Sequence, residues 1–189
     1  MPSYQVEDIS LAEAQLIFDN NLKISLTSAN QKLFDNILKD KLVLSESQKN
    51  VLANFVQNGS PTTIRLGSGE RAGVAESFAN AFGRLPSSMS NYQEVVKIAN
   101  GRWTKGQSIG NENKAKESFK QIYKRSTNLA NTKDINALKV MAYGLRPVNR
   151  NMDSERAAIR TFKDVYKHNP ISTSDWDIMR AISYSGATR

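Results

Sequence analysis

The chain has 189 residues, of which 39% are hydrophobic and 23% are charged, and its mean hydropathy is −0.51. Because it has no cysteine and a single histidine, His168, disulfide frameworks, thiolate zinc sites, cysteine nucleophiles and multi-histidine metal sites are excluded. No apolar run reaches the roughly 18–20 residues of a membrane span. We therefore expect a protein without a membrane span, with a real hydrophobic core, no metal and no cofactor.

The positive charge lies in the second part of the chain. The 26 Lys/Arg and 18 Asp/Glu give a net charge of +8. Residues 1–60 hold five Lys/Arg and seven Asp/Glu, a net −2, whereas residues 61–189 hold 21 and 11, a net +10. This asymmetry indicates an anionic partner for the second part. The alternative is that the excess positive charge of residues 61–189 only keeps a helical domain in solution.

The first 60 residues contain three amphipathic stretches, LAEAQLIFDNNL, SANQKLFDNILKDKL and ESQKNVLANFVQNG. Ser10 with Glu13, and Ser45 with Gln48, have the spacing of a capping box at a helix start. Gly59-Ser60-Pro61 then breaks the pattern. We predict that residues 1–60 form a three-helix cap that closes one end of the basic region, residues 61–189.

A glycine-rich segment comes directly after the cap. The run Thr62-Thr-Ile-Arg-Leu is β-like, and Gly67-x-Gly69-x-x-Ala72 superficially matches a dinucleotide-binding fingerprint. That fingerprint requires a βαβ unit, and no second strand pattern comes after it. We therefore interpret these residues as a glycine turn that starts a helix.

The basic region contains three similar units, over about residues 70–105, 113–150 and 154–189. Their first halves carry apolar residues four apart, which form one stripe on a helix. The stripes are Val74, Phe78 and Phe82; Ala115, Phe119 and Tyr123; and Ala158, Phe162 and Tyr166. Their second halves end on Gly101, Gly144 and Gly186. The period of about 42 residues predicts an internal repeat.

Each unit is predicted to be a helical hairpin. The first helix ends near Gly83–Pro86 in the first unit and near His168–Pro170 in the third, because glycine and proline terminate helices. The second helix is predicted to begin at Asn91, at Thr132 or Asp134, and at Ser174. Since a lone hairpin cannot bury its apolar face, neighbouring units must stack. The predicted fold is all-α, with three stacked, solenoid-like hairpins after the cap.

Cationic residues supply the candidate binding positions. Arginine follows the glycine of each unit as Arg102, Arg146 and Arg189. Such a cation either bonds the last carbonyls of the helix or forms a row that clamps phosphates and carboxylates. Arg65 and Arg150 would extend that row.

A lysine ridge runs beside the aromatic stripe. Lys116, Lys120 and Lys124 are spaced four apart, and Lys163 and Lys167 repeat the last two positions in the third unit. The ridge is either a solvated helix face or a set of salt-sensitive phosphate contacts without base readout.

Structural roles are predicted for the remaining aromatic and acidic residues, except for Trp103. We expect the stripe aromatics to be core. Trp176 is expected to be packing, because it stands where Tyr92 and Ile135 stand in the other units, whereas Trp103 lacks an equivalent and is predicted to be a surface contact. Asp134 and Asp175 suit helix starts and receive no acid–base role.

The pattern Phe-x3-Phe/Tyr-x-Arg/His-x-Pro with a following Asp-Trp, as in Phe162 to Trp176, resembles helical repeat modules of bacterial surface-associated and S-layer-like proteins. The segments IANGRW, VMAYGLRP and WDIMRAISYSGATR are similar to repeats in surface proteins of uncultivated bacterial lineages. The resemblance covers about residues 62–189, and the middle unit departs from it with Thr127 in place of proline. It implies a display or attachment role without catalysis.

These observations predict a non-enzymatic interaction or structural module of a cell-surface or assembly protein. Its expected partners are a protein or an anionic surface polymer, and self-association is an open alternative. The competing hypothesis is a sequence-independent nucleic-acid binder that uses the Lys/Arg ridge. The opening MPSYQVEDIS has no secretory leader pattern. The expected location is therefore the cell surface for a fragment of an exported protein and the cytoplasm for a complete chain.

Overall fold

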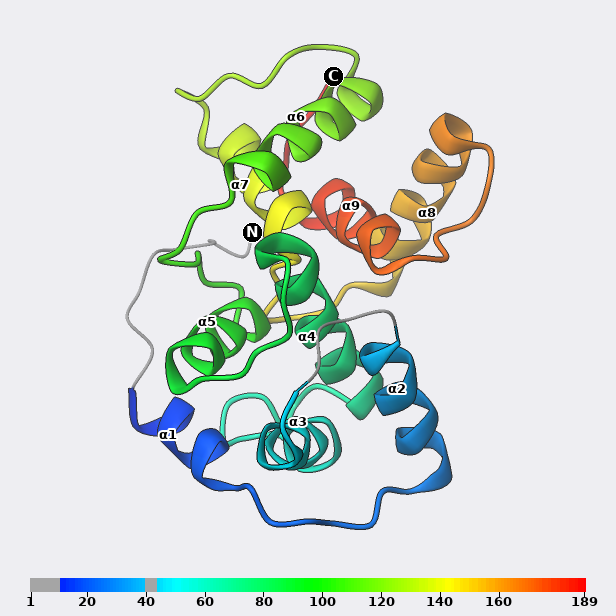
Figure 1. Ribbon diagram of the computed structural model, residues 1–189. Helices are drawn as coiled ribbons and strands as arrows, with labels where there is room; N and C mark the ends of the chain where they lie inside the picture. Colours follow the sequence, from blue (N-terminus) through cyan, green and yellow to red (C-terminus); the bar gives the residue numbers. More distant parts are fainter. Residues whose placement is uncertain (1–10, 40–43) are drawn as a thin grey trace.

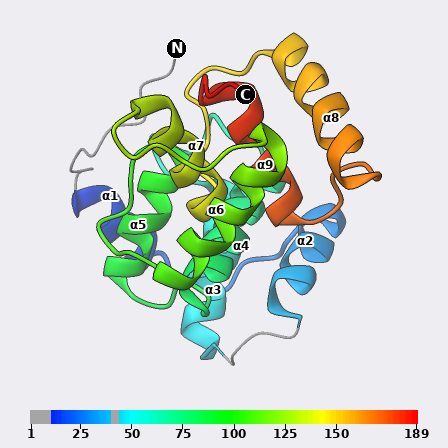
Figure 2. The same cartoon turned by 90° about the horizontal axis from the view of Figure 1, so that it is seen from above.

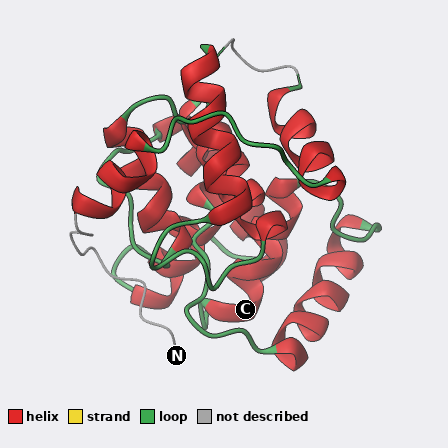
Figure 3. Cartoon of the chain, turned by 90° about the horizontal axis from the view of Figure 1, so that it is seen from below, coloured by secondary structure: helices red, strands yellow, loops and turns green. Residues whose placement is uncertain are grey.

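The computed structural model describes residues 11–39 and 44–189, and these residues form nine α-helices (Figure 1). Figure 3 shows only helices and loops over the same residues, so the predicted all-α fold class is confirmed. The first three helices are α1 (Leu11–Asp19), α2 (Ser28–Leu38) and α3 (Glu46–Asn58). The hairpins are α4 (Ser68–Phe82) with α5 (Met89–Ala99), α6 (Ile109–Tyr123) with α7 (Thr132–Tyr143), and α8 (Met152–Tyr166) with α9 (Thr173–Tyr184).

The helix ends repeat from one hairpin to the next. The first helix of each hairpin has 15 residues and ends on a left-handed residue: Gly83, Lys124 or Lys167. The glycines predicted to end the second helices, Gly101, Gly144 and Gly186, all have positive φ. Glycine adopts that conformation without a steric cost, and the two lysines are the non-glycine residues with positive φ among those described.

The hairpins stack, but not as three equal layers. α7 packs against α9 and α6 against α8, so the second and third hairpins are joined helix to equivalent helix. The first hairpin is joined to them differently, because α4 packs against α7 and α9. In Figure 1, α4 accordingly lies at the centre of the molecule, and in the view from above α6 lies in front of it (Figure 2).

α4 is buried on two faces, and its sequence explains why. Val74 and Phe78 join the main apolar cluster, while Ala75 and Ala79 join a second cluster with α2 and α3. At the positions of these two alanines, α6 carries Lys116 and Lys120. A helix with apolar residues on several sides must be covered on those sides, and α2 and α3 cover this one.

The central phenylalanine of each predicted stripe is core in all three hairpins, as is Tyr123, whereas Phe82 and Tyr166 are only partly buried against the main cluster. Phe78, Phe119 and Phe162 are each at most 1% exposed. Each contacts the aromatic residue four positions later, with ring centroids 4.8, 4.4 and 4.5 Å apart at Phe78–Phe82, Phe119–Tyr123 and Phe162–Tyr166. The repeat is therefore a repeat of packing as well as of sequence.

The N-terminal helices lie against the first hairpin. α1 packs on α5 and α3, and α2 packs on α4 and α3. Glu13 of α1 is buried and accepts hydrogen bonds from the Ser60 hydroxyl (2.5 Å) and from the Thr62 N–H (2.8 Å). Ser10, its predicted capping partner, lies outside the described residues. The β-like run that starts at Thr62 is a series of turns rather than a strand.

Two predicted helix starts are corrected. The Ser45–Gln48 capping box is present. The N-cap of α5, however, is Ser88, whose hydroxyl accepts from the Asn91 N–H. The N-cap of α9 is Ser172, which forms a capping box with Asp175. In both cases a serine two or three residues upstream reaches the free N–H groups of the first turn.

Candidate functional site

We give the name basic face to five predicted lysines: Lys116 and Lys120 on α6, Lys124 directly after it, Lys163 on α8 and Lys167 directly after it. All five are exposed. The two helices pack against each other, and both lie in the upper half of Figure 1. Nζ of Lys116 lies 3.5 Å from Asn113 Oδ1, and Nζ of Lys167 donates to the Asp164 carbonyl. Within residues 11–39 and 44–189, no lysine of the basic face forms an ion pair.

Three of the predicted arginines, Arg65, Arg146 and Arg150, bond groups of the protein itself. Arg146 is 1% exposed, so its assignment to an exposed anion-binding row is wrong. Arg65 donates to the Ala99 carbonyl at the end of α5 (2.6 Å). Arg150 is exposed, but its Nε and Nη2 both donate to Glu155 (2.9 and 2.5 Å). Arg102 is half-buried.

The two tryptophans differ from their predicted environments. Trp103 is partly buried against the main cluster, and the Lys139 ammonium lies 5.9 Å from its ring centroid. Trp176 is 36% exposed. Its equivalent Tyr92 is covered by Phe55 of α3, with ring centroids 6.1 Å apart. In the part of the chain that is described, no helix covers Trp176 in the same way.

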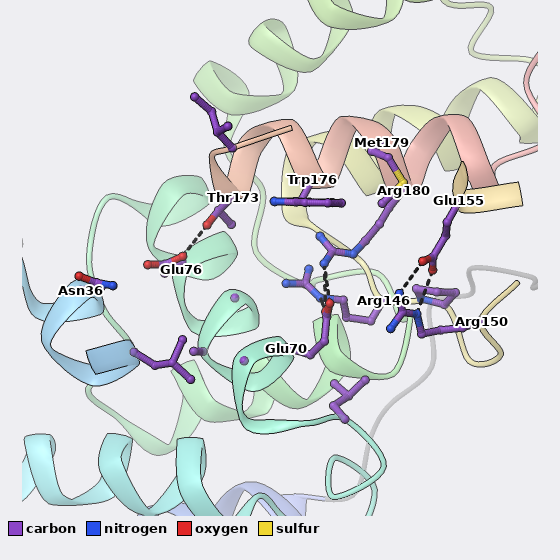
Figure 4. Close-up of a pocket in the computed structure, with 17 residues that line it drawn as sticks. Asn36, Glu70, Glu76, Arg146, Arg150, Glu155, Thr173, Trp176, Met179 and Arg180 are labelled. Atoms are coloured by element: carbon purple, nitrogen blue, oxygen red, sulfur yellow. Dashed lines mark hydrogen bonds and ion pairs between the residues drawn. The ribbon is translucent and has the colours of Figure 1, made fainter. Parts of the chain in front are cut away.

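Trp176 lines a pocket of about 520 Å³ where α2, α4, α9 and the segment 146–150 meet (Figure 4). Leu33, Leu66 and Met179 supply apolar wall. The ionisable residues that line the pocket are three arginines and three glutamates: Arg146, Arg150, Arg180, Glu70, Glu76 and Glu155.

A buried ion-pair network forms the floor of this pocket. Glu70 Oε2 accepts from Arg146 Nε at 2.8 Å and from Arg180 Nη2 at 3.0 Å. Asp177 Oδ1 accepts from Arg180 Nη1 at 2.9 Å and from Arg146 Nη1 at 3.3 Å. Its Oδ2 accepts from the Ser77 hydroxyl at 2.9 Å. The network therefore ties α4, α9 and the end of the second hairpin together.

Burial governs the ionisation of this network. It raises the pKa of Asp177 against the opposing charges of Arg146 and Arg180. It also lowers the pKa of Arg146 to about 10, with repulsion from Arg180 adding to the effect. Burial opposes ionisation of Glu70 too, but the two guanidiniums outweigh it and leave the Glu70 pKa below its ordinary value. Glu70 is thus an ionised partner of the arginines rather than a proton donor.

Close packing makes two glycines necessary beside the network. A Cβ on Gly73 would lie 2.8 Å from Arg146 Nη2. A Cβ on Gly144 would collide with the Ser77 side chain, and Gly144 also has a φ of +69°. Space for the ion-pair network thus depends on glycines from two different hairpins.

The sequence prediction missed Glu70, Asp177 and Arg180. A signal was available for two of them, because Asp177 and Arg180 are three apart on an otherwise apolar face of α9, the spacing of a helical ion pair. Asp134 and Asp175 hold the structural roles predicted for them. Asp134 accepts from the Asn128 N–H (2.8 Å), and Asp175 accepts from the Ser172 N–H (3.0 Å).

Among the described residues, no helix is both long and apolar enough to cross a bilayer. The chain matches no protein-family model, no curated protein and no solved structure. The interpretation of function therefore rests on the geometry of the basic face and of the pocket.

Proposed function

We propose that this protein is a non-enzymatic helical interaction module whose basic face binds an anionic protein or surface polymer. The observation that carries the proposal is that the predicted arginines and the predicted lysines have different partners. The arginines Arg65, Arg146 and Arg150 bond carbonyls and carboxylates of the protein itself. The lysines of the basic face remain exposed.

The scaffold beneath the basic face supports such a role. Phe119 and Phe162 anchor α6 and α8 in the core at 0% exposure, so the lysine stems project from two fixed helices. Exposed ammonium groups attract polyanions over a Debye length of about 8–10 Å, and added salt screens that attraction. A display or assembly protein would use such a face for attachment.

The second candidate function is sequence-independent nucleic-acid binding. The lysine spacing favours it, because Lys116 and Lys120 lie one turn apart on α6 and Lys124 directly follows that helix. Lysines placed in this way would contact phosphates without reading bases. The two candidates differ in the polyanion that the basic face prefers.

The test is a fluorescence-anisotropy titration at two salt concentrations. The labelled ligands are single- and double-stranded DNA and RNA, an acidic polypeptide and a sulfated polysaccharide. Tighter binding of the polypeptide or polysaccharide than of nucleic acid supports the attachment role. Tighter nucleic-acid binding, with a log–log salt slope of about −0.7 to −0.9 per phosphate contact, supports the alternative.

Two matched variants locate the binding surface. The triple substitution Lys116→Ala, Lys120→Ala and Lys124→Ala removes three charges from the basic face. The triple substitution Lys23→Ala, Lys32→Ala and Lys39→Ala removes three exposed charges from the N-terminal part. We expect only the first variant to weaken binding. Equal losses would mean that net charge, and not the basic face, drives binding, and no binding by the parent would overturn both candidates.

A further inference from the structure

The pocket beside Trp176 is a second candidate binding site, separate from the basic face. Its volume of about 520 Å³ lies within the roughly 300–1,000 Å³ of small-molecule sites. Its lining combines apolar residues, among them Leu33 of α2 and Met179 of α9, with a charged floor. Mixed lining of this kind suits a ligand with an apolar body and one charged group.

When the buried Asp177 is counted with the three glutamates of the pocket lining, carboxylates outnumber the three arginines by one. Arg150 is paired with Glu155, and Arg146 and Arg180 share Glu70 and the buried Asp177. Among the described residues that line the pocket, these pairings leave one carboxylate without a cationic partner, that of Glu76.

Among the described residues, Glu76 has one hydrogen-bond partner, Thr173, whose hydroxyl donates to Oε2 at 2.5 Å. Within the described ranges, no Lys, Arg or His nitrogen lies within 4.0 Å of its carboxylate, and its Oε1 accepts no hydrogen bond. Glu76 is only partly exposed, and a partly desolvated carboxylate gains from a cationic partner.

Trp176 lines the same pocket as Glu76 and brings an aromatic ring to it. It lies one turn after Thr173 on α9, and Figure 4 shows its indole between the Thr173–Glu76 pair and Arg180. The face of an indole ring attracts cations. The neighbouring apolar wall would accept an alkyl chain, because burying each methylene contributes about 0.8 kcal/mol in general.

We propose that this pocket binds a primary ammonium group carried on an alkyl chain. Glu76 accepts its N–H groups at the open oxygen, and Trp176 and Leu33 contact the chain. A quaternary ammonium would not fit as well, since it has no N–H to donate. An anion would have to compete with Glu70 and Glu155 for the arginines.

The experiment is isothermal titration calorimetry of the full chain with cadaverine, an unbranched alkyl diamine. The diol of the same chain length is the neutral control. We expect cadaverine to bind, the diol not to bind, and Glu76→Gln to weaken cadaverine binding about tenfold or more, as the loss of a charged hydrogen bond does. Thr173 can still donate to the amide of the variant, so the fold is retained.

Glu117→Gln is the matched control, because Glu117 is an exposed glutamate on α6 and does not line the pocket. It should bind cadaverine as the parent does. Trp176→Leu should weaken binding while keeping an apolar wall. Absence of binding at about 1 mM diamine, or equal affinity of the parent and the folded Glu76→Gln variant, would overturn the proposal.

A lysine derivative blocked at its α-amino and carboxyl groups identifies the source of the ammonium group. Tighter binding of this derivative than of cadaverine assigns the pocket to a lysine side chain of a partner protein. The reverse order assigns it to a free amine. Both orders support the ammonium site.

Discussion

Arg146 Nε donates to Glu70 Oε2 at 2.8 Å and so joins the end of the second hairpin to the first turn of α4, 76 residues away in the chain. The same guanidinium contacts Asp177 of α9. One side chain thus links all three hairpins. Since Arg146 is 1% exposed, its removal would break a buried ion pair and leave Glu70 and the buried Asp177 to share Arg180 alone among the described cations.

We therefore predict that Arg146→Met destabilises the protein by about 3–5 kcal/mol, as the breaking of a buried ion pair does. Urea unfolding followed by circular dichroism measures this change. Arg156→Met is the control, because Arg156 forms an exposed pair with Asp153 and such pairs contribute little. Equal effects of the two substitutions would show that the network does not join the hairpins.

A second prediction concerns two equivalent tyrosines. The Tyr143 hydroxyl accepts from the Ser108 N–H at 2.9 Å and donates to Glu112 at 2.7 Å. The Tyr184 hydroxyl accepts from the Asn151 N–H at 2.9 Å and donates to Glu155 at 2.5 Å. Each tyrosine thus fastens the end of one helix to the start of its hairpin partner.

Tyr143→Phe and Tyr184→Phe should each destabilise the protein by about 1–3 kcal/mol, because each removes a hydrogen bond to a carboxylate and leaves the Ser108 or Asn151 N–H without its partner. Tyr92→Phe is the matched control. The Tyr92 hydroxyl is buried without a hydrogen-bond partner in the described residues, so its removal should be neutral or stabilising. Thermal unfolding compares the three variants, and a loss at Tyr92 equal to that at Tyr143 would contradict the assignment.

The helices and the ion-pair network differ in how far the sequence could predict them. Phe119 lies in a local pattern of period four, which is sufficient to predict both its helix and its burial. Arg146 has no such pattern, because its burial depends on Glu70 and Asp177, which lie 76 and 31 residues away. A sequence position after a helix-ending glycine looks the same whether the arginine caps that helix or enters the core.

The tryptophans show the same limit. Analogy with Tyr92 predicts a core position for Trp176, but burial of Tyr92 depends on Phe55 of α3, which covers only the first hairpin. An internal repeat predicts which residues are equivalent. It does not predict which neighbour covers each one, because the N-terminal helices break the symmetry of the stack.

A third prediction is loss of stability in acid. The hydrogen bond from Arg125 lowers the pKa of Asp134 below its ordinary value of 3.8. A carboxyl whose pKa is lower in the folded state stabilises the fold above its ordinary pKa, and this contribution is lost as the pH falls through the folded value. Burial raises the pKa of Asp177, so the contribution of this carboxyl to stability changes with pH in the opposite direction.

Burial also opposes ionisation of Glu112, but hydrogen bonds from Lys139 and Tyr143 outweigh it and lower its pKa below 4.5. The urea concentration at the unfolding midpoint should therefore decrease as the pH is lowered from neutral to below about 4. Asp134→Asn should flatten this dependence. A variant with the same pH dependence as the parent would exclude Asp134 as a source of acid sensitivity.

The last prediction concerns the left-handed ends of α6 and α8. Lys124 and Lys167 have φ of 59° and 64°, whereas the equivalent residue of the first hairpin is Gly83. A side chain with a Cβ is strained in this region, and glycine is not. Lys124→Gly and Lys167→Gly should therefore each stabilise the protein by about 0.5–1 kcal/mol, although glycine also adds freedom to the unfolded chain.

Lys120→Gly provides the contrast, since Lys120 lies within α6, where glycine costs roughly 1 kcal/mol relative to alanine. All three substitutions remove one lysine of the basic face, so differences in stability between them come from backbone conformation. The same variants then test function, because each should weaken polyanion binding whatever the sign of its effect on folding. If Lys124→Gly raises the melting temperature and yet lowers polyanion affinity, the lysine at this helix end contributes to binding and not to the stability of the fold.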